Sequence, residues 1–412
     1  MSFNYKMVNE LVISSLETSS RHPRYIVSFK GQNFEINQSL FVFITMLQNA
    51  GSIEEAARRY SLDSGREYSV EDIQEIINEY IQPFFKEDDK PKGSFLIKIE
   101  IIPKDIVNTI VQFAKHLFNI KILFFFAIVS LLLNIGFFIQ QEELLYSLQD
   151  LNLYDLVAVL LIFLFSSLFH ELGHASACKY YGFDANSIGF GVYINIPVFY
   201  ADVSAIWGLS RKDRLVVNIG GIYFQSILLA IACIIYFSTG SALMKYFIIL
   251  TNINFLFVLN PFMKFDGYWI VSDLLGVPNL RQRTIETMFY CLQTPKLRKK
   301  QEKPFLLSMN NPAKFLMIFY AILVNLFMVF FFCYFLPKFI ISYIKELPLI
   351  VTYIADTISI GIIPFDTFLY FIPRTILVLF MIWFLWKVIF NLIIWGHQTF
   401  KKKASNKLPI YI

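Results

Sequence analysis

Two histidines and a glutamate form a compact pattern that is typical of metal-dependent hydrolysis. His170, Glu171 and His174 lie in the sequence H-E-L-G-H, within the largely apolar stretch 161–180. Because residues four apart share one face of a helix, the two imidazoles lie side by side. This spacing suits a zinc ion, and Glu171 can take a proton from a water that the metal holds. Structural histidines at a helix end are the alternative, but polar groups in a membrane-length apolar helix are costly and usually mark function.

A third ligand is predicted at Asp266, which follows the apolar stretch 243–263 in the sequence N-P-F-M-K-F-D-G. The proline of this sequence interrupts the helix and frees backbone groups at or near membrane depth. A carboxylate there needs a cation, and zinc on the two histidines would supply one while keeping a position open for water. Ion pairing of Asp266 with Lys264 or with a basic residue of a loop is the alternative. Cys178 continues the histidine face by four residues and is a further candidate ligand, with a small buried residue as its other interpretation.

The pair of motifs resembles the site-2 protease family of intramembrane zinc metalloproteases, over roughly residues 150–275. The resemblance implies that His170, His174 and Asp266 bind zinc and that Glu171 is the general base in peptide-bond hydrolysis. The family's sequence L-D-G is F-D-G here, which is a conservative apolar exchange.

A second departure from the family concerns the middle of a helix. The family's motif G-P-x-x-N corresponds to G-I-Y-F-Q at 221–225. The resemblance implies that Gln225 stands where the family has the asparagine that polarises the scissile carbonyl. The nearby Asn218 is the alternative for this role.

The composition indicates a membrane protein with several spans. Of 412 residues, 56% are hydrophobic and 16% are charged, whereas soluble proteins carry roughly 25% charged residues. A net charge of +5 is modest and indicates positive cytoplasmic loops rather than a nucleic-acid surface. Stretches near the roughly 20 residues that a bilayer requires are found at about 120–140, 156–180, 214–237, 243–263, 313–336 and 370–395.

The loop charges predict the orientation of these spans. The segment 141–155 has acidic residues and no Lys or Arg, whereas 211–214, 281–303 and 401–403 are basic. The positive-inside rule then places both termini in the cytoplasm, with six spans and the two histidines near the cytoplasmic end of the second. A seventh span at 347–363 would carry the C-terminal lysines outside, so we expect a partly embedded external segment there.

Residues 1–92 are expected to form a separate cytosolic domain. Two strands joined by a turn, then a helix, are predicted at 25–29, 32–36 and 39–48. Ser52 and Ser69 each begin the capping-box pattern S-x-x-[DE] and open two further helices. The predicted fold class is therefore mainly α: a polytopic membrane helical bundle of about six spans with a small α+β, winged-helix-like N-terminal domain.

The charge of this domain indicates which kind of partner it can bind. Residues 52–88 contain ten acidic and four basic side chains, the wrong sign for a phosphate-binding helix face, so no nucleic-acid partner is expected. The order of elements, over about 70 residues, resembles the PqqD-like domain, which binds leader peptides of ribosomally made, modified peptides. A regulatory or assembly domain without a peptide ligand is the alternative.

The domain is followed by a connecting region at 93–119, in which we expect a strand over 94–102 and then an interfacial helix, and by a transmembrane metalloprotease domain at 120–400. Within that domain the stretch 188–200 is rich in Gly and in β-branched or aromatic residues, which predicts strands. The functional interpretation is an edge that holds an extended substrate by strand addition. A structural hairpin is the alternative.

Together these observations predict an integral membrane zinc endopeptidase that cleaves near the cytoplasmic face and matures a small ribosomally made, secreted or modified peptide. Its expected partners are a peptide or membrane-protein substrate and the lipid bilayer. Regulated intramembrane proteolysis of a signalling protein is one alternative. A non-enzymatic transporter or immunity protein that keeps the fold is another.

The predicted topology can be tested by cysteine-accessibility labelling. In a variant that lacks the natural cysteines, single cysteines at positions 149 and 406 should be labelled from opposite sides of the membrane, because an odd number of spans separates an external loop from a cytoplasmic C-terminus. Labelling of both positions from the same side would contradict the six-span arrangement.

Overall fold

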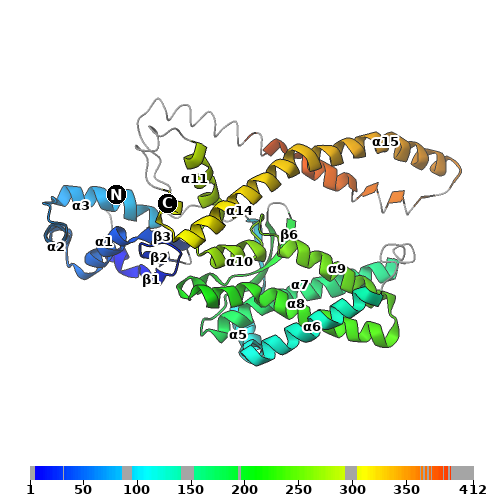
Figure 1. Cartoon of the computed structure of the whole chain (residues 1–412), viewed down its shortest axis with the longest axis horizontal. Coiled ribbons are helices and arrows are strands. Elements are labelled where there is room, and N and C mark those ends of the chain that lie inside the picture. The colour runs from blue at the N-terminus through cyan, green and yellow to red at the C-terminus, as the bar shows by residue number, and fades with distance from the viewer. Residues whose placement is uncertain are drawn as a thin grey trace. The chain divides into compact units, whose positions relative to one another are not determined.

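The computed structural model describes residues 5–30, 32–85, 95–140, 153–193, 196–292, 304–361 and, with short gaps, 363–390 (Figure 1). The chain divides into two compact units, Met1–Met317 and Ile318–Ile412. The first unit holds the N-terminal sheet, a second sheet and the helices that carry the predicted metal ligands.

The N-terminal region is a three-stranded antiparallel sheet followed by short helices. Its sheet has the order β1–β2–β3, and its elements are η1 (Tyr5–Glu10), β1 (Val12–Leu16), β2 (Arg24–Phe29), β3 (Gln32–Asn37), α1 (Gln38–Asn49), α2 (Ile53–Ser64), α3 (Val70–Ile76), the π-helical turn η2 (Ile77–Ile81) and α4 (Gln82–Phe85). The two predicted strands and the predicted helix starts are confirmed. Strand β1 was not predicted, because its serines interrupt the apolar alternation; it pairs along its whole length with β2.

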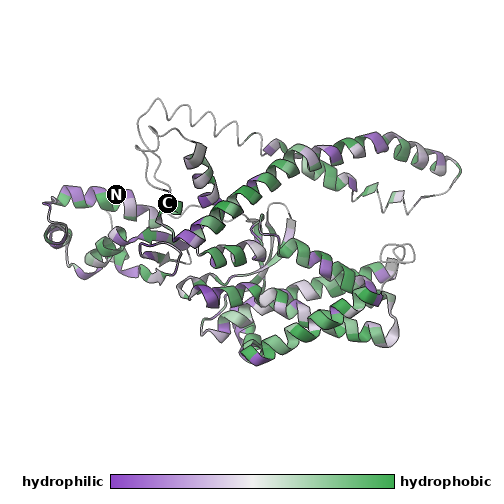
Figure 2. Cartoon of the chain, in the orientation of Figure 1, coloured by the Kyte–Doolittle hydropathy of each residue, from purple (hydrophilic) through white to green (hydrophobic). Residues whose placement is uncertain are grey.

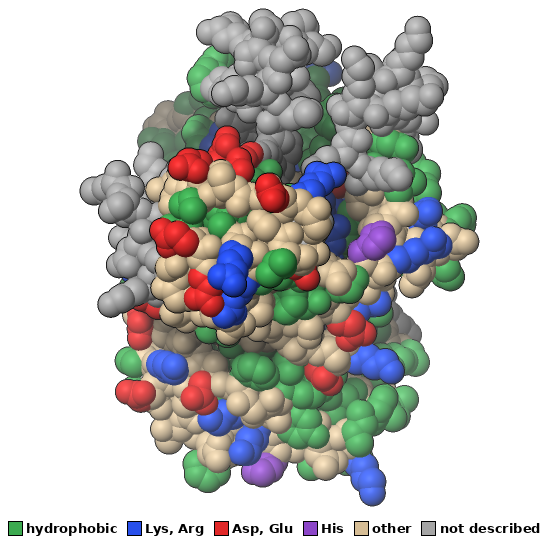
Figure 3. All heavy atoms as spheres, turned by 90° about the vertical axis from the view of Figure 1, so that its left-hand side faces the viewer, with side chains coloured by type: hydrophobic (Ala, Val, Ile, Leu, Met, Phe, Trp, Pro, Cys, Tyr) green, Lys and Arg blue, Asp and Glu red, His purple; other side chains and the backbone are tan. Residues whose placement is uncertain are grey.

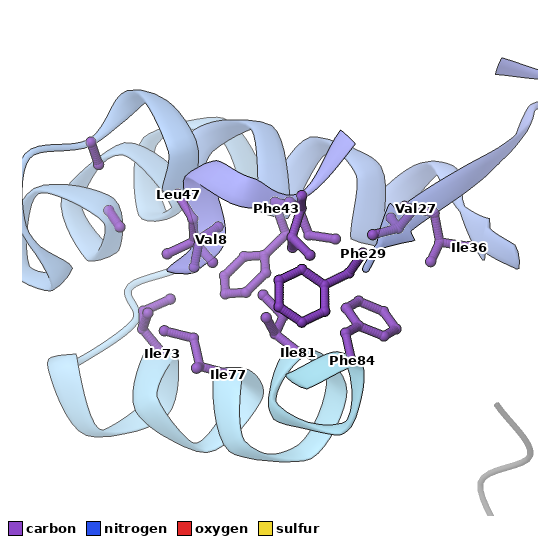
Figure 4. Packing of buried hydrophobic residues seen from close by; sticks show 14 of the residues in the cluster. Val8, Val27, Phe29, Ile36, Phe43, Leu47, Ile73, Ile77, Ile81 and Phe84 are labelled. Carbon is purple, nitrogen blue, oxygen red and sulfur yellow. The ribbon is translucent and has the colours of Figure 1, made fainter. Parts of the chain in front are cut away.

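One face of this sheet packs on the helices to form an apolar core. Side chains spaced four residues apart on α3 and η2 meet residues from the sheet and from α1 (Figure 4). The buried residues labelled there are Val8, Val27, Phe29, Ile36, Phe43, Leu47, Ile73, Ile77, Ile81 and Phe84. Each large side chain that is fully buried contributes about 1.5–3 kcal/mol to folding. Whether this region belongs to the winged-helix class stays a prediction.

Serine caps begin two of these helices. The hydroxyl of Ser69 accepts from the N–H of Asp72, and the Asp72 carboxylate accepts from the N–H of Ser69, which is a reciprocal capping box. The backbone N–H of Ser69, and next its hydroxyl, lower the pKa of Asp72. Ser52 likewise caps α2, but the Glu55 carboxylate there accepts from the N–H of Gly51 instead of Ser52.

A second antiparallel sheet combines a strand that precedes the long helices in sequence with two strands that lie between α7 (Leu153–Tyr180) and α8 (Arg211–Thr239). It has the order β4–β5–β6, with β4 (Phe95–Ile102), β5 (Ile188–Tyr193) and β6 (Ile196–Ala201). The strand expected at 94–102 and the strands expected within 188–200 are confirmed, and β4 pairs with β5 across more than eighty residues of chain. Both β4 and β6 are edge strands, so one long side of β6 is not paired with another strand of this sheet.

Helix α5 (Lys104–Ala114) is amphipathic and is followed by the 3-10 turn η3 (Lys115–Phe118). Val107 and Val111 are fully buried against α7 and β5, whereas Ile106, Ile110 and Phe113 are exposed. This pattern agrees with the interfacial helix that the sequence predicts, because an apolar outer face can lie against a bilayer surface.

Four helices in the described part of the chain are long and apolar enough to cross a membrane (Figure 2). They are Ile120–Gln140 (α6), Tyr154–Tyr180 (within α7, Leu153–Tyr180), Arg211–Thr239 (α8) and Asn311–Ser359 (α14, Asn311–Phe330; η6, Phe331–Phe335; α15, Leu336–Ser359). Helix α9 (Ala242–Val258) is shorter, so the apolar helix expected over 243–263 ends earlier, because Pro261 follows. The predicted span 370–395 lies partly outside the described residues, and the six-span count stays a prediction.

The last of these helices differs from the expected pattern. We expected a span that ends near residue 336 and a separate external segment at 347–363. The helix instead passes through the π-helical turn η6 and continues as α15 to Ser359, with Pro348 inside it.

Helices α7 and α8 approach each other through glycines. A Cβ atom on Gly173 would lie 2.2 Å from the carbonyl oxygen of Gly220, so the two backbones are in direct contact. Small residues allow this close approach, which is a common way for helices to associate in membranes. Helix α8 also packs against α6, α9 and α10 (Asp266–Leu275), and it is therefore the central helix of the first unit. The remaining described elements of this unit are η5 (Ser204–Gly208), α11 (Leu280–Leu292) and α13 (Phe305–Ser308).

Candidate metal centre

Three predicted ligands converge at one point. His170 and His174 project from α7, and Asp266 is the first residue of α10. The Asp266 Oδ2 atom lies 2.9 Å from His170 Nε2 and 3.2 Å from His174 Nε2, and the two Nε2 atoms are 3.1 Å apart. Ligands at the roughly 2.0–2.2 Å typical of zinc sites lie about 3.3 Å from one another in a tetrahedral arrangement. The spacing therefore fits a single metal ion.

The hydrogen bonds behind the imidazoles determine which nitrogens face this point. His174 Nδ1 lies 2.8 Å from the carbonyl oxygen of Val217, which can only accept, so Nδ1 carries the proton. His170 Nδ1 lies 3.3 Å from Gln225 Oε1 and donates to it in the same way. Both Nε2 atoms then present lone pairs to each other and to the Asp266 carboxylate. Three lone-pair donors in a buried site repel one another unless a cation binds between them.

Gln225 lies behind His170 in a buried polar network. Its Oε1 also accepts from Asn254 Nδ2 at 3.2 Å, and its Nε2 donates to Ser166 Oγ at 3.0 Å. The side chain is fully buried. These contacts hold the ring of His170 in place, which is the usual role of an acceptor behind a metal-binding histidine. Sequence reasoning did not select Ser166 or Asn254, although polar residues inside apolar helices are a signal that could have found them.

Asn218 forms a hydrogen bond with Asp273 and not with the potential metal ligands. Its Nδ2 donates to Asp273 Oδ2 at 2.8 Å, beside the ion pair that Asp273 forms with Arg214 at 2.7 Å. Both amides proposed to polarise a scissile carbonyl therefore have partners within the protein, and that role stays a prediction for each.

The structure also bears on two alternatives that the sequence left open, the partner of Asp266 and the role of Cys178. Asp266 pairs with the two histidines, and not with Lys264, in the ion pairs of the described residues. Cys178 is fully buried in an apolar cluster with Phe118 and Phe224 and does not belong to the group of potential metal ligands. The structure therefore favours the small buried residue as the interpretation of Cys178.

Glu171 projects toward the edge of the second sheet. Its Oε2 accepts from the backbone N–H of Ala201, the last residue of β6, at 2.7 Å. That N–H is thus not used in the ladder with β5. Glu171 thus joins α7, which carries the two potential histidine ligands, to the end of the edge strand β6.

A cavity of about 970 Å³ joins these groups. The three potential ligands and Glu171 line it, together with many aromatic side chains: Phe190, Tyr193, Phe199, Tyr200, Trp207, Phe257, Phe265 and Trp269. Burial raises the pKa of Tyr200, and the nearby carboxylates of Asp202 and Glu100 raise it further, so its hydroxyl stays protonated near neutral pH. A mostly apolar cavity with a few convergent polar groups is typical of a ligand or active site.

Comparison with known proteins gives one similarity. The chain is 25% identical over 123 residues to a Bacillus subtilis protein named "Putative peptide zinc metalloprotease protein YydH". The matched region covers 29% of this chain and 49% of that protein, so the chain spans about half the length of this relative. No family model and no solved structure matches the chain. The likeness supports a function of the metalloprotease type.

Substitution of Gly221 should prevent metal binding. A Cβ atom at this position on α8 would lie 2.3 Å from His170 Nε2 and 2.5 Å from His174 Nε2. We expect Gly221→Ala to displace the imidazoles and to lower the bound metal, measured by elemental mass spectrometry of purified protein, by tenfold or more. Gly136→Ala is the matched control, because the nearest atom to its Cβ would be 3.8 Å away. Full metal content in Gly221→Ala would contradict the site.

Proposed function

We propose that this chain is a zinc endopeptidase of the site-2 protease type, embedded in the membrane and hydrolysing peptide bonds near its cytoplasmic face. The observation that carries the proposal is the convergence of His170, His174 and Asp266 beside Glu171 in one cavity. These four residues are the ligand set and the base that metal-assisted hydrolysis needs. The similarity to a protein named as a peptide zinc metalloprotease agrees with it.

Zinc is the metal that this ligand set fits. Two imidazoles and one carboxylate are a common protein ligand set for catalytic zinc, which keeps a fourth position open. When bound, zinc lowers the pKa of a coordinated water toward neutrality and polarises a carbonyl group. The site suits this chemistry because the neutral Nε2 atoms are already directed inward by Val217 and Gln225.

Glu171 performs the proton transfers in this proposal. Its carboxylate takes the proton of the attacking water and then delivers it to the nitrogen of the leaving amine. The bond to the N–H of Ala201 fixes one carboxylate oxygen, Oε2, while the other can face the cavity. This bond holds the base in place without neutralising it.

The sheet edge offers a way to present the substrate. A helical substrate hides its amide bonds, whereas an extended segment can add to the unpaired side of β6 by main-chain hydrogen bonds. Glu171 contacts the end of that strand, so an added segment would pass close to the base and to the metal ligands. This position supports the strand-addition interpretation of residues 188–200 over a purely structural hairpin.

The N-terminal region provides substrate recognition in this proposal. It would bind an extended segment of a small precursor peptide in the cytosol and raise its concentration at the metal centre, which can multiply apparent affinity about 10²–10⁴-fold. Acidic side chains on α2 and α3 outnumber basic ones, and Figure 3, which looks at the side where these helices lie, shows charges of both signs interspersed among the described residues. Peptide maturation fits this surface better than nucleic-acid binding.

Glu171→Gln should remove activity and keep the metal. The exchange preserves the shape of the side chain and an acceptor for Ala201, but it removes the base, which is typically worth roughly 10²–10⁴-fold in rate. Cleavage of a membrane-tethered peptide reporter by reconstituted protein measures the effect. Glu100→Gln, on the other edge strand β4 of the same sheet, is the control and should cleave normally. Near-normal turnover by Glu171→Gln would exclude the proposed base.

The N-terminal region should bind peptide and not DNA. A binding titration of full-length Glu171→Gln protein with a precursor peptide should saturate, since this variant does not consume its substrate. Titration with duplex DNA at two salt concentrations should show little affinity, because the acidic helices repel phosphates. Tight, salt-sensitive DNA binding would instead favour a membrane-tethered regulator.

A further inference from the structure

Helix α10 connects the metal centre to the N-terminal region. Asp266 is its first residue and Leu275 its last, so the two ends are about 14 Å apart at 1.5 Å per residue. Its first turn is tightly packed, because a Cβ atom on Gly267 would lie 2.1 Å from the carbonyl oxygen of Leu259. Because the helix is short and continuous, a displacement of its far end would also move Asp266.

The far end of α10 is held by the connection between β1 and β2, which we call the clamp segment, Glu17–Arg21. Ser19 donates from its N–H to the carbonyl of Gly276 at 2.8 Å and from its hydroxyl to the carbonyl of Leu275 at 2.5 Å. These are carbonyls that a helix end leaves without intrahelical partners. Gly276 has a positive φ of 63°, and a Cβ atom there would lie 2.6 Å from Ser19 Oγ. The clamp segment thus fits closely on this helix end.

Two arginines of α8 join the same contact. Arg211 donates to the carbonyl of Asp273 at 2.8 Å, and its own N–H donates to the Glu17 carboxylate at 2.9 Å. Arg214 forms the buried ion pair with Asp273 and also donates to the carbonyl of Glu17 at 3.2 Å. Both guanidiniums lie near the C-terminal end of α10, where positive charge is favourable for the helix dipole. The clamp segment therefore contacts α8 and α10 together.

The same face of α8 reaches the metal centre. Arg211, Arg214, Asn218, Gly221 and Gln225 are spaced by three or four residues and share one side of the helix. The first three hold the far end of α10, directly or through Asp273, while Gly221 contacts both imidazoles and Gln225 supports His170. The position of Asp266 relative to the histidines therefore depends on how α10 is registered on α8.

We propose that the clamp segment positions Asp266 at the metal centre by fixing α10 on α8, with Ser19 as its central positioning residue. This inference rests on the proposed function, because it takes the two histidines and Asp266 as the metal ligands. A peptide that bound to the N-terminal sheet and shifted β1 or β2 would then change the affinity for the metal. By linkage, metal binding changes the affinity for that peptide by the same factor.

Zinc affinity of the full-length protein, measured by competition with a chromophoric chelator, tests the proposal. Ser19→Ala removes the hydroxyl that donates to the carbonyl of Leu275 and accepts from Arg211 Nη1. It should weaken zinc binding about three- to tenfold, because a typical hydrogen bond contributes about 0.5–1.5 kcal/mol. Ser20→Ala is the matched control: its hydroxyl contacts Ser308 and the N–H of His22, on the other side of the same segment, and it should change affinity less than twofold. The visible spectrum of the cobalt-substituted protein should shift in Ser19→Ala and not in Ser20→Ala.

A second variant distinguishes a specific effect on zinc binding from a general loss of folding. Glu17→Gln weakens the bond from the Arg211 N–H and removes the negative charge beside the Arg211 guanidinium. It should lower zinc affinity in the same direction as Ser19→Ala but by a smaller factor, with an unchanged unfolding midpoint of the metal-free protein. Equal zinc affinities and spectra for Ser19→Ala, Glu17→Gln and Ser20→Ala, together with loss of zinc in Asp266→Ala, would overturn this inference and leave the proposed function standing. Wild-type zinc affinity in Asp266→Ala would instead overturn the metal site itself.

Discussion

The backbone contact between α7 and α8 is the constraint on which the candidate metal centre depends. Gly173 and Gly220 bring the two helices so close that no larger residue fits between them. This approach places the carbonyl of Val217 behind His174 and leaves Gly221 directly against both imidazoles. The rotamers and tautomers of the histidines follow from that geometry. A metal site built on two packed helices is held more precisely than one built on loops.

Several buried amides in the helix bundle pair with polar groups on neighbouring helices, which favours one arrangement around the site. Gln225, Ser166 and Asn254 connect three helices behind His170, and a reciprocal pair of amides joins Asn134 of α6 to Asn252 of α9. A buried polar group that lost its partner would cost about 1–3 kcal/mol, so alternative packings of these helices are disfavoured. The apolar outer faces of the same helices remain free to contact lipid.

The sequence predicted the three residues that could hold a metal, but not the way in which they are supported. His170, His174 and Asp266 could be selected because histidines four apart and a carboxylate after a helix break are strong local signals, although 96 residues separate the first from the last. The contacts of Gln225 and Asn218 could not be predicted, since they depend on which way each amide points in the folded bundle. The pairing of β4 with β5 and the clamp segment on α10 join distant stretches that carry no mutual pattern. Two helix ends also differ from the prediction: α9 ends before Pro261, and the helix expected to end near residue 336 continues through η6 and α15 to Ser359.

In the proposed enzyme, two imidazoles and one carboxylate hold a single zinc ion. X-ray absorption at the zinc edge of the purified full-length protein tests it most directly. We predict one zinc per chain with only nitrogen and oxygen neighbours at about 2.0–2.2 Å and the scattering pattern of two imidazoles, a pattern that is lost when His170 or His174 is replaced. A sulfur neighbour near 2.3 Å, or an unchanged spectrum after Asp266→Ala, would contradict the ligand set and with it the proposed enzyme.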